Sequence, residues 1–211
     1  MQIAIPEGQL SAGCLAQATL QGGRTTVWPA PQPIQAIADP RFLGTRFQDN
    51  ALIHAGLVPR VLVQASNQTA NVLGWGGKKI RDAETWATPA AQLLMQRALL
   101  MFCRATNSLA AHCVDRWINV METSDYSVPH CHYEADAAVV YSLDPGDFDP
   151  SSTSDGRFEL IDPRVPFCCP SRPERPTRGI MPELHGGTMI MFPAEWLHHV
   201  KPYYGLSLIH I

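Results

Sequence analysis

The sequence predicts an α+β fold in which a helical region precedes a β-rich part of the jelly-roll or sandwich kind. One long segment carries apolar residues at helical spacing, whereas the segments after about residue 115 are short, β-rich and separated by Pro- and Gly-containing turns. The 18 prolines in 211 residues are nearly double the usual share, which indicates short elements joined by rigid turns. A chain of this length forms a single domain with a sizeable core.

We expect residues 1–24 to be a loosely structured lead-in and residues 25–211 to form the domain. Within it, the helical part covers about 82–107 and the β-rich part about 115–211. Thr25 to Trp28 resembles a strand, closed by the proline-rich residues 29–33, which cannot continue a ladder. The stretch Arg60 to Gln64, with three adjacent apolar residues, predicts another short strand.

The segment from Asp82 to about Asn107 predicts a helix with Pro89 in a first turn. Its apolar residues recur at spacings of three, four and seven, which gives one buried face: Leu93, Leu94, Ala98, Leu99, Met101, Phe102 and Ala105. These side chains are read as core.

Four later segments predict strands, at residues 116–122, 139–143, 157–161 and 187–192. Asp144 to Asp147 breaks the pattern as a turn. Cys168 to Pro182 carries four prolines and is read as a long surface excursion.

Charge and composition exclude several classes of partner. The net charge is -3 and the longest basic run is Lys78-Lys79, so neither nucleic acid nor a membrane surface is expected. Apolar segments stay shorter than the roughly 18 residues of a membrane span, and the N-terminus lacks the pattern of a signal peptide. We therefore expect a cytoplasmic protein whose six cysteines are mostly reduced and structural.

The most informative stretch runs from Pro129 to Asp136. If it is extended, four side chains of metal-ligand type point to one side, because strand residues alternate faces: His130, His132, Glu134 and Asp136. Cys131 would then face the other way. A second histidine segment, Phe192 to Val200, follows about seventy residues later.

Two histidines at i and i+2, joined by a third nitrogen ligand from a distant strand, form one face of an octahedral metal centre. The remaining positions stay open for oxygen and substrate, which is how non-haem Fe(II) oxygenases are arranged. Zinc prefers a closed tetrahedral set, or three ligands and water.

Several pieces in a fixed order resemble the 2-oxoglutarate- and Fe(II)-dependent oxygenases, in particular a subgroup with His-x-His in place of His-x-Asp. The pieces are Trp117-x-Asn119-Val120, His130-x-His132, Tyr141, Gly156-x-x-x-Leu160-x-Asp162-Pro163-Arg164, Phe192-Pro193 and Leu197-His198-x-Val200-x-Pro202. The similarity covers roughly residues 70–205.

This resemblance implies a double-stranded β-helix (jelly-roll, cupin-like) core with iron held by His130, His132 and His198. It also implies 2-oxoglutarate as co-substrate and oxidation, usually hydroxylation, of an unidentified substrate. His198 is preferred over His199 because the ligand directly follows the leucine in the motif. Asn119 and Tyr141 are the candidate co-substrate-binding residues, and core packing is the alternative reading of Tyr141.

The sequence departs from the family pattern at two places. His132 occupies the position of the usual carboxylate, so the third ligand is His132 itself, which we favour, or Glu134 or Asp136. The family's co-substrate-anchoring arginine, expected about ten residues after His198, is absent, and no arginine follows Arg178. Residues 206–211 resemble translated sequencing adapter, so we expect a C-terminally truncated chain that binds 2-oxoglutarate poorly and leaves a strand edge unpaired.

Two alternatives remain beside the oxygenase. One is a non-catalytic cupin-like binding domain, and the other is a metal-dependent hydrolase or isomerase on the same scaffold. The substrate, a small molecule or a side chain, is not specified by the sequence. A homodimer is left open.

Overall fold

A computed structural model describes residues 10, 15–37, 41–68, 77–147, 152, 155–161, 179–206 and 208–211. Helices combine with sheets whose strand pairings, throughout these residues, are antiparallel. The expected combination of helices and short strands is therefore confirmed. Asp162-Pro163-Arg164 and most of the excursion expected over Cys168 to Pro182 lie outside the described residues.

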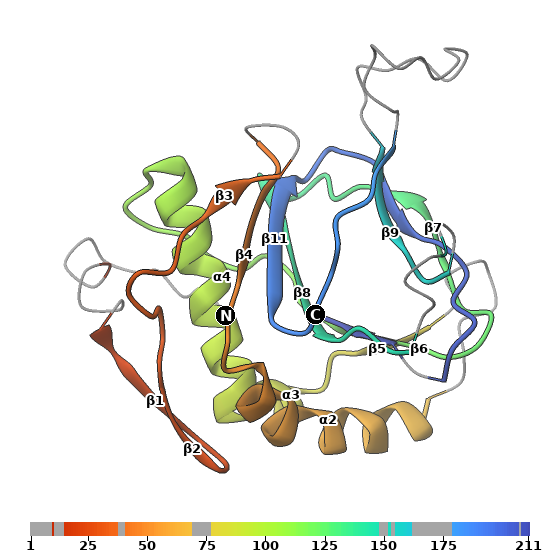
Figure 1. The fold of residues 1–211 in the computed structure, drawn as a ribbon, viewed down its shortest axis with the longest axis horizontal. Coiled ribbons are helices and arrows are strands. Elements are labelled where there is room, and N and C mark those ends of the chain that lie inside the picture. The colour runs from red at the N-terminus through yellow and green to blue at the C-terminus, as the bar shows by residue number, and fades with distance from the viewer. Residues whose placement is uncertain are drawn as a thin grey trace.

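The strands form one hairpin and two larger sheets (Figure 1). The hairpin pairs β1 (Gln17–Leu20) with β2 (Gly23–Thr26), so a strand already begins within the lead-in expected over residues 1–24. The four-stranded sheet has the order β10-β9-β12-β7, with bounds Gly179–Ile180, Phe158–Ile161, His198–Val200 and Ser127–His130. The seven-stranded sheet has the order β3-β4-β11-β8-β13-β6-β5, with bounds Gln35–Ala36, Leu43–Arg46, Thr188–Pro193, Ala137–Asp144, Leu208–His210, Ile118–Met121 and Lys78–Ile80.

Helix α2 (Asn50–Ser66) corrects the strand expected at Arg60 to Gln64. Its buried positions recur with helical spacing over four turns: Ile53, Leu57, Val58, Val61 and Ala65. This long period outweighs the local β preference of three apolar residues, because burying one continuous face stabilises the helix more than propensity opposes it.

Helix α4 (Pro89–Thr106), preceded by the short α3 (Ala83–Trp86), confirms the helix expected from residue 82. The Thr88 side chain caps it by accepting a hydrogen bond from the Ala91 amide, and Pro89 occupies the first helical position, where no amide donor is needed. Asn107 ends the helix in the left-handed conformation with a φ of 55°.

A buried ion pair ties α4 to the N-terminal part of the chain. The fully buried Arg97 donates to both carboxylate oxygens of Asp49, at 2.9 and 2.6 Å, and to the carbonyls of Val27 and Thr26. Its guanidinium also lies 4.0 Å from the ring centroid of Phe47. Each of these partners compensates part of the cost of burying the charge.

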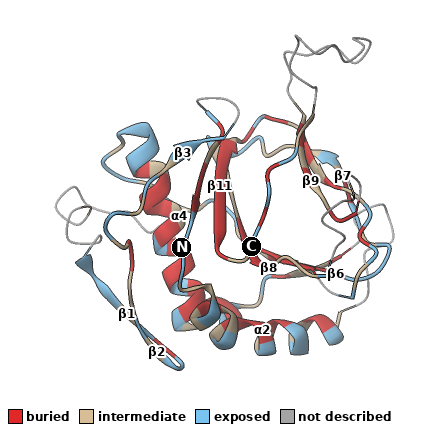
Figure 2. Cartoon of the chain, in the orientation of Figure 1, coloured by how far each residue is buried: buried red, intermediate tan, exposed pale blue. Residues whose placement is uncertain are grey.

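The seven-stranded sheet separates two hydrophobic clusters. On one face, alternate residues of its strands pack against α2 and α4, among them Ile80, Ile118, Val120 and Met191. On the other face, residues such as Met121, Ile190 and Phe192 pack against Phe158, Leu160 and Val200 of the four-stranded sheet. Figures 1 and 2 show the helices on one side of this sheet and β7 and β9 on the other, with buried residues along the strands between them.

Residues 208–210 form β13, which pairs with β6 on one side and β8 on the other. The edge expected to be unpaired is therefore occupied. Of its three residues, Leu208 and His210 face the space between the two sheets, whereas Ile209 packs with the helices.

None of the helices in the described part of the chain combines the length with the apolar character that a membrane span requires.

Candidate metal centre

Three histidines meet between the two sheets at the end of the four-stranded sheet. His130 ends β7 and His198 begins β12, and the two residues are directly opposite each other in the antiparallel ladder. His132 follows β7, and its amide is held by the carbonyl of Ala194 at 2.8 Å. One ring nitrogen of each histidine lies within 4.8 Å of the others, and Nε2 of His132 is 3.2 Å from Nε2 of His198.

Glu134 and Asp136 do not join this cluster. The strand that carries His130 stops at that residue, and a turn at Tyr133 and Glu134 interrupts the extended backbone on which the expectation depended. Both acidic residues are exposed. The expectation that four side chains share one strand face is therefore wrong for these two carboxylates.

Hydrogen bonds define which ring nitrogens face the cluster. Nδ1 of His130 is 2.8 Å from the carbonyl oxygen of Val128, and Nδ1 of His198 is 3.1 Å from that of Trp196. A carbonyl oxygen only accepts, so each Nδ1 carries the proton and donates it. Each Nε2 is then an unprotonated donor atom of the kind that binds metals.

Burial keeps the three imidazoles neutral. It lowers the pKa of His198 to about 3 and that of His132 to about 4, and it lowers the pKa of His130 as well. Nearby positive charge adds to the effect, because Lys79 lowers the pKa of both His130 and His132. Neutral imidazole is the form that ligates a metal.

Aromatic rings enclose the cluster from the core side. Phe192 lies 4.9 Å and Phe158 lies 5.8 Å from the His198 ring, centroid to centroid. On the other side, the Trp117 ring is 5.5 Å from that of His132. His198 is buried, whereas His130 and His132 are half-buried, so the cluster is open to solvent on their side.

Tyr141 lies on the wrong face of the sheet for the predicted role of co-substrate binding. Its ring is buried with the helix-facing cluster, and its hydroxyl donates to Oδ1 of Asn50 on α2 at 2.9 Å. Tyr141 therefore packs in the core, which is the alternative that the sequence analysis gave for it. The neighbouring Ser142 points the opposite way, because successive strand residues alternate faces.

Asn119 lies on the face that points toward the histidines. It is directly opposite Lys79 on β5 and His210 on β13 in the ladder, and His210 lines the space between the sheets. Residues directly opposite in a ladder share a face. Its role in binding a co-substrate stays a prediction.

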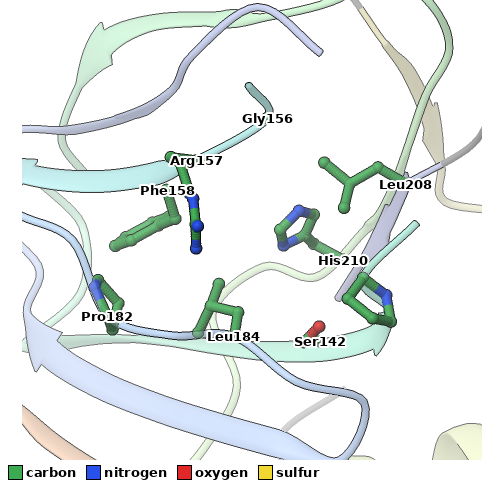
Figure 3. A pocket seen from close by; sticks show the side chains of 9 residues that line it. Ser142, Gly156, Arg157, Phe158, Pro182, Leu184, Leu208 and His210 are labelled. Atoms are coloured by element: carbon green, nitrogen blue, oxygen red, sulfur yellow. The ribbon is translucent and has the colours of Figure 1, made fainter. Parts of the chain in front are cut away.

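A small cavity of about 20 Å³ lies between the sheets, beside Phe158. Figure 3 shows Arg157 and His210 extending toward this space, together with Phe158 and Leu208. Ser142 Oγ and both ring nitrogens of His210 are buried there without a hydrogen-bond partner among the described residues. Burial lowers the pKa of His210 to about 4.

Sequence reasoning missed Lys79 and Arg157 as residues near the site. Lys79 belongs to a strand of only three residues, too short to read from periodicity. The alternation of Lys79, Ile80 and Arg81 was the available signal. Arg157 was visible as the first residue of a predicted strand, but the direction of its side chain was not.

Comparisons with known proteins address the fold. No protein-family model and no curated protein matches the sequence. A prolyl-4-hydroxylase structure from Pseudomonas putida is similar with a TM-score of 0.54 and 14% sequence identity, over 81% of this chain and 89% of that chain. A structure of an oxidoreductase of the 2OG-Fe(II) oxygenase family from Burkholderia pseudomallei has a TM-score of 0.43 and 13% identity, over 99% of this chain and 81% of that chain. The chain thus has the fold of the Pseudomonas putida prolyl-4-hydroxylase.

Proposed function

We propose that this protein is a non-haem Fe(II)- and 2-oxoglutarate-dependent oxygenase that hydroxylates an unidentified substrate. The observation that carries the proposal is the three-histidine cluster of His130, His132 and His198, set between two sheets with its half-buried side toward solvent. The similarity in fold to a prolyl-4-hydroxylase supports it.

We further infer that strands β6 to β13 make a double-stranded β-helix. Support comes from the strand orders, because β6, β8, β11 and β13 belong to the larger sheet, whereas β7, β9, β10 and β12 belong to the smaller. Successive strands mostly alternate between the two sheets, as winding a hairpin into a jelly roll requires. The helices before β6 would then form the N-terminal helical region, and residues 25–211 one domain.

The donor atoms fit a divalent metal ion. Two nitrogens each about 2.1 Å from a metal and at right angles lie about 3 Å apart, close to the separation of the His132 and His198 nitrogens. The Nδ1 bonds to Val128 and Trp196 hold two rings with Nε2 toward the shared centre. His130, His132 and His198 would hold the ion, and Glu134 and Asp136 are too exposed to take their place.

Bound iron would supply the activation of oxygen coupled to decarboxylation of the co-substrate. The chain's own residues have supporting tasks. Phe158 and Phe192 exclude water behind His198, and Asn119 offers an amide on the inward face for a co-substrate oxygen. Near the expected position of the family's arginine, β13 carries Leu208 and His210, so weak 2-oxoglutarate binding is expected of this chain.

The test is an anaerobic titration of the purified chain with Fe(II) and then 2-oxoglutarate, followed by visible spectroscopy. A charge-transfer band that saturates with one equivalent of iron supports the proposal. No retained iron and no band would contradict it.

A metal-dependent hydrolase or isomerase is the second candidate, because an all-nitrogen set of three histidines with an open position also suits catalytic zinc. Metal analysis of protein purified without added metal distinguishes the two. A non-catalytic cupin-like domain is the third reading, under which ligand binding would survive the substitution His198→Ala. A cytoplasmic location, a homodimer and the absence of nucleic-acid and membrane partners stay predictions.

A further inference from the structure

Four residues on the inward face of β5, β6 and their extensions form a group that we call the cationic ledge: Lys79, Arg81, Trp117 and Asn119. Lys79 and Asn119 are directly opposite in the ladder, and Arg81 and Trp117 lie two residues beyond each along their strands. Because strand residues two apart share a face, all four point to the side where the histidines lie.

The ledge is built around the Trp117 ring. The ammonium of Lys79 is 4.6 Å and the guanidinium carbon of Arg81 is 4.8 Å from the ring centroid, which suits cation–π contact. The same ring lies 5.5 Å from that of His132. The two cations are thus held beside the solvent-facing side of the proposed metal centre.

The carboxylate of Asp115 lies beside the two cations of the ledge. Asp115 accepts two hydrogen bonds from Arg81, at 2.6 and 2.7 Å, and both come from Nη1. Lys79 is half-buried, and burial together with the charge of Arg81 lowers its pKa, so an incoming anion would favour its charged form.

We infer that the cationic ledge binds a carboxylate of the substrate and so directs a carboxylate-bearing molecule to the three histidines. The inference rests on the proposed function, since the ledge selects what reaches that centre. Lys79 supplies a charge-assisted hydrogen bond, Arg81 a second cation, and Trp117 an apolar wall for the carbon chain that follows the carboxylate.

The test compares a matched acid and amide, N-acetyl-L-alanine and N-acetyl-L-alaninamide, which differ only in carrying a carboxylate or a neutral amide, on the Mn(II)-loaded chain. Proton relaxation of the probe by the paramagnetic ion reports whether it binds near the histidines. We expect the acid to bind and the amide to bind at least about fivefold more weakly, because the charged interaction is partly exposed. Equal binding of the two probes, or no binding of the acid, would overturn the inference.

Variants assign the effect to the ledge. Lys79→Gln should weaken binding of the acid about fivefold to tenfold and leave binding of the amide unchanged. Lys79→Arg should retain the preference for the acid over the amide. Lys78→Gln is the matched control, because Lys78 is the neighbour on the opposite face of β5 and pairs with Glu122 at 2.7 Å. If Lys78→Gln loses the preference for the acid, or if Lys79→Gln keeps it, the cationic ledge is not the carboxylate-binding site.

Two further arms separate the sources of failure. Saturating 2-oxoglutarate should leave the acid probe bound. If 2-oxoglutarate displaces the acid, the ledge binds the co-substrate, and the inference that it binds the substrate is overturned. If the chain does not retain Mn(II), the proposed function fails. Calorimetry of the same acid and amide with the metal-free chain then still decides whether the ledge prefers carboxylates.

Discussion

The two faces of the seven-stranded sheet have opposite chemistry although they share every strand. The helix-facing side is packed with apolar residues, and the hydroxyl of Tyr141 is paired there with Asn50. The inward side carries Lys79, Asn119, Ser142 and His210 in one row across four neighbouring strands. One face therefore stabilises the fold, whereas the other leaves polar groups available for ligands.

The largest expected effect is on the helix-facing side. Arg97→Met removes a buried cation and leaves the Asp49 carboxylate without its main partner, so the free energy of unfolding should fall by about 3–5 kcal/mol. Urea denaturation measures this loss. Iron affinity of the remaining folded protein should be unchanged, and a large loss of iron binding would show that the two faces are not independent.

The next effect belongs to the inward side. His198→Ala should weaken metal binding by about 100-fold or more. Removing a residue that only hydrogen-bonds a metal ligand already lowers metal affinity about 10- to 100-fold, and His198 is proposed as a ligand itself. His199→Ala is the matched control, since that side chain contacts Glu159 at 3.1 Å. Equilibrium dialysis with Fe(II) measures both variants. Similar losses in the two would refute the assignment of His198.

A pH effect of intermediate size should come from the buried histidines. The folded pKa of His198, about 3, lies below its ordinary value of 6.5, so below pH 6.5 the unfolded chain takes up a proton that the folded chain refuses. Stability of the metal-free protein is therefore complete above pH 6.5 and falls toward pH 3, with a slope of up to about 1.4 kcal/mol per pH unit for this group. Urea denaturation from pH 7 to 4.5 measures the slope, which His198→Gln should reduce. An unchanged slope would contradict the burial argument.

The smallest effect tests the placement of Tyr141. Tyr141→Phe removes one hydrogen bond to Asn50 and should cost about 1 kcal/mol of stability. Affinity for 2-oxoglutarate, measured by the charge-transfer band, should stay the same. Weaker binding of 2-oxoglutarate by this variant would instead support a role of Tyr141 in binding the co-substrate.

The sequence allowed the elements with a long or regular pattern to be predicted. Helix α4 and strands β6, β8, β9 and β11 were expected close to their observed positions. Helix α2 was missed, because Pro59 and a Val-rich run hid its period. The side of the sheet on which Tyr141 lies could not be predicted. Residues 137–143 are mostly apolar on both faces of the strand, so polar and apolar residues do not alternate in a way that distinguishes the faces.

For the site, the spacing of the histidines in the sequence identified the residues that meet, whereas the path of the backbone between them could not be predicted. His-x-His and the Leu-His pair identified the three residues that meet, because their motifs are local. The turn after His132 excluded Glu134 and Asp136, and no residue type in that stretch required it. Lys79 was missed because its neighbours in space are about forty residues away in sequence.

The hydrogen bonds from His130 and His198 to carbonyls two residues earlier have a consequence for metal exchange. Both rings are held by backbone next to them in the chain, Val128 in β7 and Trp196 in the bend before β12, so removing an ion should not require the strands to move. Little conformational entropy is then lost when an ion enters, and affinity depends on the donor atoms rather than on ordering the chain. The metal-free protein should accordingly be reloaded repeatedly without refolding.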